Sequence, residues 1–165
     1  MTKKPLKIIG INPGTRYLGI TVFDGPELMD WRIKVLKEKW SKEKMKKAIK
    51  IISEFMERYQ PNVLAIKKLH PSRRSENLLR LLNKIKEFAR RRNLKVFQYS
   101  IKEIEKSFIK GGKLNKRNLI EAVVKLYPIL HYDLNKERNH RNPYYFRMFE
   151  AVALASACAQ RFGKS

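Results

Sequence analysis

The segment Ile8–Gly19 constrains the fold more than any other part of the chain. Its first residues, Ile8-Ile9-Gly10-Ile11, form an apolar run that predicts a buried strand, and Pro13-Gly14 then turns the chain back. In α/β proteins the side chain that ends such a strand lies at the rim of the sheet, where phosphate- and metal-binding groups gather. Here that side chain is Asn12, a neutral amide that forms hydrogen bonds but is a poor ligand for a hard divalent cation. A hydrolase that uses such a cation is expected to carry a carboxylate at this position.

The charge of the chain is strongly unbalanced. Among 165 residues there are 38 Lys and Arg but only 15 Asp and Glu, which gives a net charge of +23. This excess predicts a polyanionic partner, with nucleic acid favoured over an anionic membrane surface. The hydrophobic content of 43% suffices for one core, so we expect a single domain over residues 1–165.

The sequence gives no indication of a membrane-spanning or secreted protein. No apolar run reaches the roughly 18 residues that a spanning helix needs, and residues 1–5 lack the apolar stretch of a signal peptide. We therefore expect a cytoplasmic protein. Cys158 is the only cysteine, which excludes an internal disulfide and a cysteine-based zinc site, and its small apolar neighbours predict a place in the core.

The order of predicted elements indicates an α/β fold. Three strands joined by short turns form an antiparallel meander: Lys7 to Ile11, Tyr17 to Asp24 and Leu28 to Leu36. Two helix–strand pairs follow, namely a helix that Ser41 caps and that ends before Pro61, the strand Val63 to Ile66, a helix from Ser75 to Arg92 and the strand Leu94 to Tyr99. Further helices are predicted from Ile101, from about Asn115 to Tyr127 and from about Phe146 to Arg161. This order predicts a five-stranded mixed sheet, with three antiparallel strands followed by parallel ones and helices on both faces.

Several segments, in order, resemble the RuvC-type Holliday-junction resolvases of the ribonuclease H-like superfamily. Ile8 to Gly19 resembles that family's first motif, Gly-x-Asp-Pro-Gly-x-x-x-x-Gly, and Leu64 to Leu69 resembles its second, an apolar strand that ends in Glu. Phe97 to Lys116 resembles the stretch that leads into its basic, glycine-containing DNA-contact loop. Arg147 to Ala155 resembles its closing-helix motif, Asp-x-x-Asp-Ala-x-Ala-hydrophobic-Ala. The resemblance implies a ribonuclease H-like domain that binds branched DNA, and a two-fold dimer, since a four-way junction presents paired strands.

The resemblance also implies a site of four carboxylates that hold Mg²⁺ or Mn²⁺ for phosphodiester hydrolysis. The matching positions in this chain are Asn12, Lys67, Arg147 and Glu150, of which only the last is acidic. Repulsion between a divalent cation and two fixed positive charges opposes metal binding. We therefore expect no metal cofactor and no cleavage, with Lys67 and Arg147 as fixed phosphate ligands and Glu150 paired with one of them.

The nucleic-acid contacts that we predict are all basic. The Gly111-Gly112 loop lets the backbone approach a ligand closely, and the helix that starts after it presents free N–H groups to a phosphate. Two arginines follow the second motif strand, where the family places residues that contact the junction. The predicted contacts are Lys67, Arg73, Arg74, Lys113, Lys116, Arg117 and Arg147.

Several assignments have alternatives in the sequence. Asn12 could cap the Pro13-Gly14 turn, Lys68 rather than Lys67 could face the site, and Arg147 could lie on the exposed face of the closing helix. Other acids could replace the missing metal ligands: Asp24, Asp30, Asp133 and Glu137. Asp133 and Glu137 are expected in a loop folded over the site. Three functional classes stay open: a DNA-binding protein that does not cleave, with RNA as an alternative ligand; a divergent Mg²⁺- or Mn²⁺-dependent nuclease; and a non-catalytic subunit of a nuclease complex.

Overall fold

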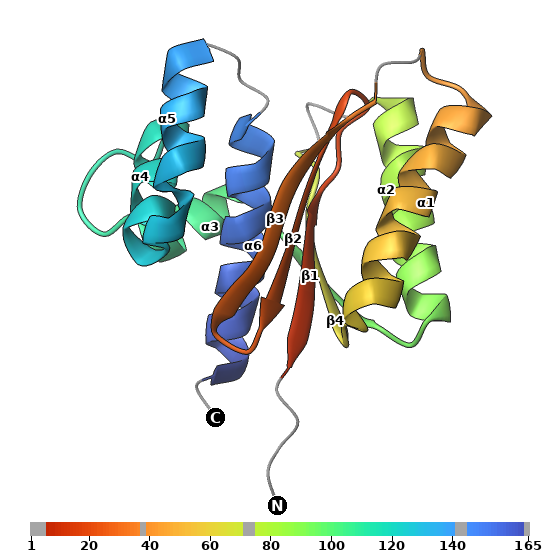
Figure 1. Ribbon diagram of the computed structural model, residues 1–165, viewed down its shortest axis with the longest axis horizontal. Coiled ribbons are helices and arrows are strands. Elements are labelled where there is room, and N and C mark those ends of the chain that lie inside the picture. Colours follow the sequence, from red (N-terminus) through yellow and green to blue (C-terminus); the bar gives the residue numbers. More distant parts are fainter. Residues whose placement is uncertain (1–5, 37–38, 71–74, 141–144, 164–165) are drawn as a thin grey trace, which may run out of the picture.

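A five-stranded sheet forms the centre of the computed structural model, which describes residues 6–36, 39–70, 75–140 and 145–163, without the side chains of 137–140 and 163 (Figure 1). The strands are β1 (Lys7–Asn12), β2 (Tyr17–Asp24), β3 (Glu27–Val35), β4 (Val63–Lys67) and β5 (Lys95–Tyr99), in the order β3-β2-β1-β4-β5. β1, β2 and β3 pair antiparallel, whereas β1, β4 and β5 pair parallel. The predicted mixed sheet is confirmed, although the third strand begins and ends one residue earlier than expected.

The helices are α1 (Lys42–Tyr59), α2 (Glu76–Arg91), α3 (Ile101–Phe108), α4 (Lys116–Leu126), α5 (His131–His140) and α6 (Tyr145–Gly163), with a 3₁₀ turn at Pro128–Leu130. Polar side chains cap the starts of several of them, and the predicted cap at Ser41 is confirmed. The Ser41 hydroxyl accepts from the Lys44 N–H, and the Asn115 side chain accepts from the Asn118 N–H.

Helix α5 corrects an expectation from the sequence. The region of Asp133 and Glu137 was expected to be a loop folded over the site, but both residues lie within this helix. Its sequence shows little helical periodicity of apolar residues, and Leu134 alone is buried among residues 131–136. The helix therefore depends on packing against its neighbours rather than on a recognisable apolar stripe.

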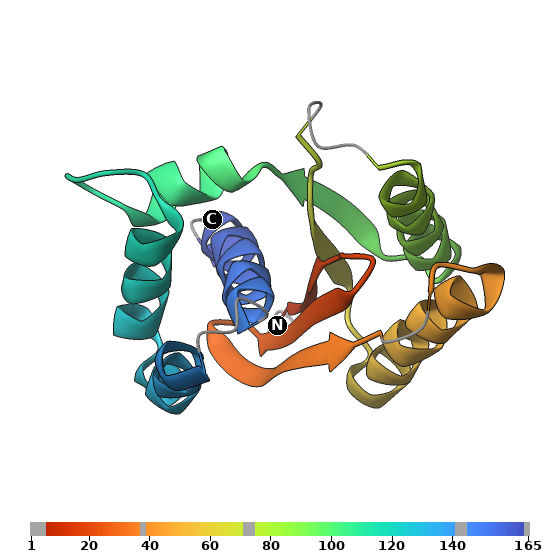
Figure 2. The same cartoon turned by 90° about the horizontal axis from the view of Figure 1, so that it is seen from above.

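Helices cover both faces of the sheet, as the two views show (Figures 1 and 2). α1 and α2 lie on one face, whereas α6 lies directly on the other with α3, α4 and α5 outside it. Alternation along β1 divides its apolar side chains between the two cores: Ile8 packs toward α6, whereas Ile9 and Ile11 pack toward α1 and α2. The central strands are buried on both faces, which explains their continuous apolar runs.

Helix α6 approaches the sheet unusually closely. A Cβ on Gly10 would lie 2.8 Å from both the Ala151 carbonyl oxygen and the Ala155 Cβ, so the small residues of β1 and α6 face each other without intervening side chains. This contact sets the packing distance between α6 and β1 and thereby the position of the first turns of α6. Because α6 starts at the end of the sheet where β1 and β4 finish, polar residues from all three elements are brought together (Figure 1).

Candidate functional site

The register of two neighbouring strands places Asn12 beside Lys67. β1 and β4 are parallel, and Ile11 pairs with Ile66, so the next residue of each strand lies at the same end of the sheet. The first two turns of α6 carry Arg147 and Glu150 above this end. The structure thus brings together the four positions that the sequence motifs indicated.

Asn12 is fully buried and links β1 to α6. Its Nδ2 donates to Glu150 Oε1 at 2.9 Å and to the Arg147 carbonyl oxygen at 3.2 Å. Its Oδ1 is also buried and accepts no hydrogen bond from the described residues. The sequence left open that Asn12 caps the Pro13-Gly14 turn, but none of these contacts is such a cap. The Asn12 amide instead holds the start of the closing helix.

Glu150 is paired with Lys67. The Lys67 Nζ lies 3.3 Å from both carboxylate oxygens of Glu150, and the two side chains are 23% and 3% exposed respectively. Lys68 is exposed, so the strand directs Lys67 rather than its neighbour toward the site. With Arg147 added, two cations and one carboxylate leave these positions with a formal charge of +1.

The Pro13-Gly14 turn lies directly under the Arg147 side chain. The Arg147 Nη1 donates to the Pro13 carbonyl oxygen over 3.5 Å, and a Cβ on Gly14 would lie 3.0 Å from the same nitrogen. On β2, a Cβ on Gly19 would lie only 2.3 Å from the Arg147 carbonyl oxygen. These two glycines make room for the guanidinium and for the backbone of α6, a role that the sequence analysis did not identify although both belong to the first motif.

The start of α4 lies next to the first turn of α6. Lys116 places its Nζ 4.6 Å from the centre of the Phe146 ring, and Phe146 immediately precedes Arg147. The loop before α4 is held by Asn118, whose Nδ2 donates to the Lys113 carbonyl oxygen at 2.8 Å. Lys113, Lys116 and Arg117 are exposed. The Arg117 ion pair with Glu121 spans 3.6 Å at the surface, so it constrains the guanidinium weakly.

Other residues that the sequence put forward lie elsewhere. Asp24 pairs in register with Lys7 at the opposite end of the sheet, Asp30 accepts from Tyr59 and Arg32, and Asp133 accepts from the Trp31 indole. Within the residues that the structure describes, no three His, Cys, Asp or Glu side chains gather as metal ligands would. Arg73, Arg74 and the side chain of Glu137 lie outside the described residues.

Cys158 lies in the core between α6 and the sheet, as predicted. Burial raises the pKa of its thiol, which keeps the sulfur protonated at neutral pH. A buried, protonated thiol is a poor nucleophile, so Cys158 has no place in the chemistry of the site.

The family model for the crossover junction endodeoxyribonuclease RuvC matches residues 8–136. The chain belongs to the RuvC family. The match extends from the start of β1 into α5 and so includes Asn12, Lys67 and the start of α4. No curated protein sequence matches the chain.

Solved structures agree with the family assignment. The RuvC of Thermus thermophilus has 18% sequence identity and a TM-score of 0.74, with 96% of this chain and 97% of that chain covered. The same protein in complex with a Holliday junction substrate has 17% identity and a TM-score of 0.74, with 96% of each chain covered. The Fowlpox virus resolvase in complex with Holliday junction DNA has 16% identity and a TM-score of 0.62, with 96% of this chain and 100% of that chain covered. At these identities the likeness establishes the ribonuclease H-like fold.

Among the helices of residues 6–36, 39–70, 75–140 and 145–163, none is long and apolar enough to cross a membrane.

Proposed function

We propose that this chain binds branched DNA, with four-way junctions as the preferred form, through contacts to the phosphate backbone and without cleaving it. The observation that carries the proposal is the Lys67 ammonium, which holds both oxygens of Glu150 at 3.3 Å. Glu150 is the only acid among the four motif positions. The group that would have to bind a metal ion is thus already neutralised by a side chain.

The residues present do not fit a divalent cation. Mg²⁺ and Mn²⁺ require several oxygen ligands, and carboxylates supply the charge that offsets their dehydration. Here a cation would have to displace Lys67 from a 3% exposed carboxylate and remain close to Arg147. Asn12 directs its amide nitrogen rather than its oxygen toward Glu150, so it adds a donor where a metal ion needs an acceptor.

The same arrangement suits a phosphate. Arg147 retains most of its donors, because its Nη1 contact with the Pro13 carbonyl is long at 3.5 Å. A guanidinium can hold two phosphate oxygens with parallel hydrogen bonds. Lys113, Lys116 and Arg117 extend the positive surface from this point along the start of α4, whose free N–H groups also favour an anion. Lys67 contributes mainly by cancelling the charge of Glu150, which would otherwise repel the phosphate.

The preference for branched DNA rests on the family and on two relatives whose structures contain Holliday junction DNA. The net charge of +23 supports backbone contacts that are independent of base sequence. A junction with two-fold symmetry would suit a homodimer, which we include in the proposal.

The test combines binding and cleavage in one assay. Purified protein is incubated with a labelled four-way junction or a linear duplex of the same sequence, in Mg²⁺, Mn²⁺ or EDTA. We expect tighter binding of the junction, the same affinity in EDTA and no cut strands. Metal-dependent cutting that disappears in a Glu150→Ala variant would overturn the absence of cleavage, and equal affinity for junction and duplex would overturn the preference.

A matched pair of variants tests the site itself. Arg147→Gln removes the proposed phosphate ligand and should weaken junction binding by about tenfold, with a shallower dependence on salt. Lys125→Gln removes the same charge from an exposed position at the other end of α4 and should change binding much less. Equal effects of the two variants would mean that net charge alone, and not the motif site, governs binding.

A further inference from the structure

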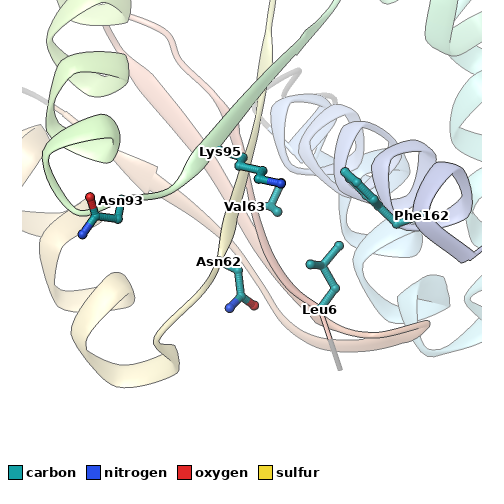
Figure 3. Close-up of a pocket in the computed structure, with 6 residues that line it drawn as sticks. All are labelled: Leu6, Asn62, Val63, Asn93, Lys95 and Phe162. Carbon is teal, nitrogen blue, oxygen red and sulfur yellow. The ribbon is translucent and has the colours of Figure 1, made fainter. Parts of the chain in front are cut away.

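A second candidate site lies at the opposite end of the sheet. A cavity of about 290 Å³ opens where β4 and β5 begin, and it is lined by Leu6, Asn62, Val63, Asn93, Lys95 and Phe162 (Figure 3). Lys67 ends the same strand that Val63 begins, so the two sites are separated by the length of β4, roughly 13 Å at 3.3 Å per residue. No residue of the cavity belongs to the site described above.

The floor of the cavity is apolar because of the strand register. Val63 pairs with Ile8 on one side and with Lys95 on the other, so these side chains project from the α6 face, as does that of Leu6 two residues before Ile8. Phe162 forms the wall from the last turn of α6. It remains 37% exposed and packs edge-to-face on Phe97 with ring centres 5.2 Å apart.

Polar groups border this apolar floor. Lys95 extends across Val63 on the side of Phe162, whereas the Asn93 carboxamide points away (Figure 3). Asn62 is held firmly, because its Oδ1 accepts from the Lys7 N–H at 2.9 Å and its backbone oxygen accepts from the Lys95 N–H at 3.1 Å. Its Oδ1 lies on the side of Leu6, whereas its Nδ2 points away from Leu6 and Phe162 (Figure 3).

The electrostatics of the cavity are positive. None of its six lining residues is acidic, and Lys95 is exposed. Arg161 lies next to Phe162 in sequence and places its guanidinium 5.4 Å from the centre of the Phe97 ring, which positions a second cation near the wall. An exposed aromatic ring and two cations beside a small apolar floor are the groups that single-stranded nucleic-acid sites use for base and phosphate.

We propose that this cavity binds one unpaired nucleotide, with the base against Phe162 and Val63 and the 5′-phosphate near Lys95 and Arg161. The volume of about 290 Å³ suits one base rather than a duplex. Because none of these residues belongs to the motif site, the proposal does not depend on junction binding.

The test measures anisotropy of a fluorescein-labelled oligothymidylate with the full chain and four variants. Phe162→Ala should weaken binding at least about fivefold, whereas Phe162→Trp, which keeps a stacking surface, should restore it. Phe162→Ala leaves the net charge unchanged, so general attraction to the +23 chain cannot account for its effect. Lys95→Gln should weaken binding more than the control Lys125→Gln. Thermal unfolding of each variant excludes loss of fold as the cause.

A second experiment distinguishes binding of a free nucleotide from binding of a nucleotide within a strand. If dTMP shifts the ring signals of Phe162 in an NMR titration, the site takes the mononucleotide itself; if only the oligonucleotide shifts them, the site reads a nucleotide within a strand. Both results support the proposal. It is overturned if neither ligand shifts these signals, or if Phe162→Ala binds the oligonucleotide as tightly as the unmodified chain. The Arg147→Gln variant should keep this binding, so failure here and failure of the junction assay are distinguishable.

Discussion

The pairing of Lys67 with Glu150 makes a specific prediction about stability. Removing one partner of a buried ion pair costs about 3–5 kcal/mol, because the remaining charge stays buried without compensation. Lys67→Met should cost less than that, about 2 kcal/mol, since the Lys67 side chain is 23% exposed and Asn12 still donates to Glu150. With a denaturant dependence of about 2 kcal/mol per molar urea, the unfolding midpoint should fall by about 1 M.

Removing the other partner of the ion pair should destabilise the fold less than Lys67→Met does. Glu150→Gln removes the buried charge, retains an oxygen for the Asn12 amide, and leaves a lysine that can turn into solvent, so it should cost under about 1 kcal/mol. The double variant Lys67→Met/Glu150→Gln should be more stable than Lys67→Met alone by at least about 1 kcal/mol.

Urea unfolding of the two single variants, the double variant and the unmodified chain checks this reasoning. If Lys67→Met unfolds within about 0.5 kcal/mol of the unmodified chain, or if the double variant loses the sum of both single losses, the ion pair does not compensate a buried charge. The interpretation of Lys67 as the internal counter-ion of Glu150 would then be wrong.

Three further predictions follow from individual contacts. Gly19→Ala should cost about 2 kcal/mol or more in thermal unfolding, because its Cβ would lie 2.3 Å from a backbone oxygen of α6. The hydrogen bond that Tyr59 donates to Asp30, together with burial, raises the pKa of the phenol above 10.0. The stability that this hydrogen bond contributes is complete below about pH 10 and is lost as the pH rises through the raised pKa. Tyr59→Phe should therefore cost about 1 kcal/mol at pH 7 and flatten the decline of stability at alkaline pH. Cys158, which is fully buried and has a raised pKa, should resist thiol reagents until urea unfolds the chain; rapid labelling of the folded protein would contradict its core position.

Much of the fold could be predicted from local sequence. The apolar run before Asn12 and the continuous run from Val63 fixed two central strands, because only strands covered on both faces have such patterns. Ser41, Ser75 and Asn115 marked the starts of three helices, since their side chains satisfy backbone N–H groups that the helix cannot. α5 was missed because it lacks an apolar stripe and is stabilised by packing on α4 and α6 and by the hydrogen bond from Trp31 to Asp133.

For the candidate site, the sequence by itself determined which residue types occupy the four motif positions and that only one of them is acidic. Tertiary structure alone decided how these residues interact. Glu150 could have paired with Arg147 on its own helix, yet it pairs with Lys67, which is 83 residues away and belongs to another element. That choice depends on the register of β1 with β4 and on the height at which glycines allow α6 to pack, and neither is encoded within a single local segment. The cavity beside Phe162 has the same origin, because it is bounded by side chains that only the packed sheet and the end of α6 bring together.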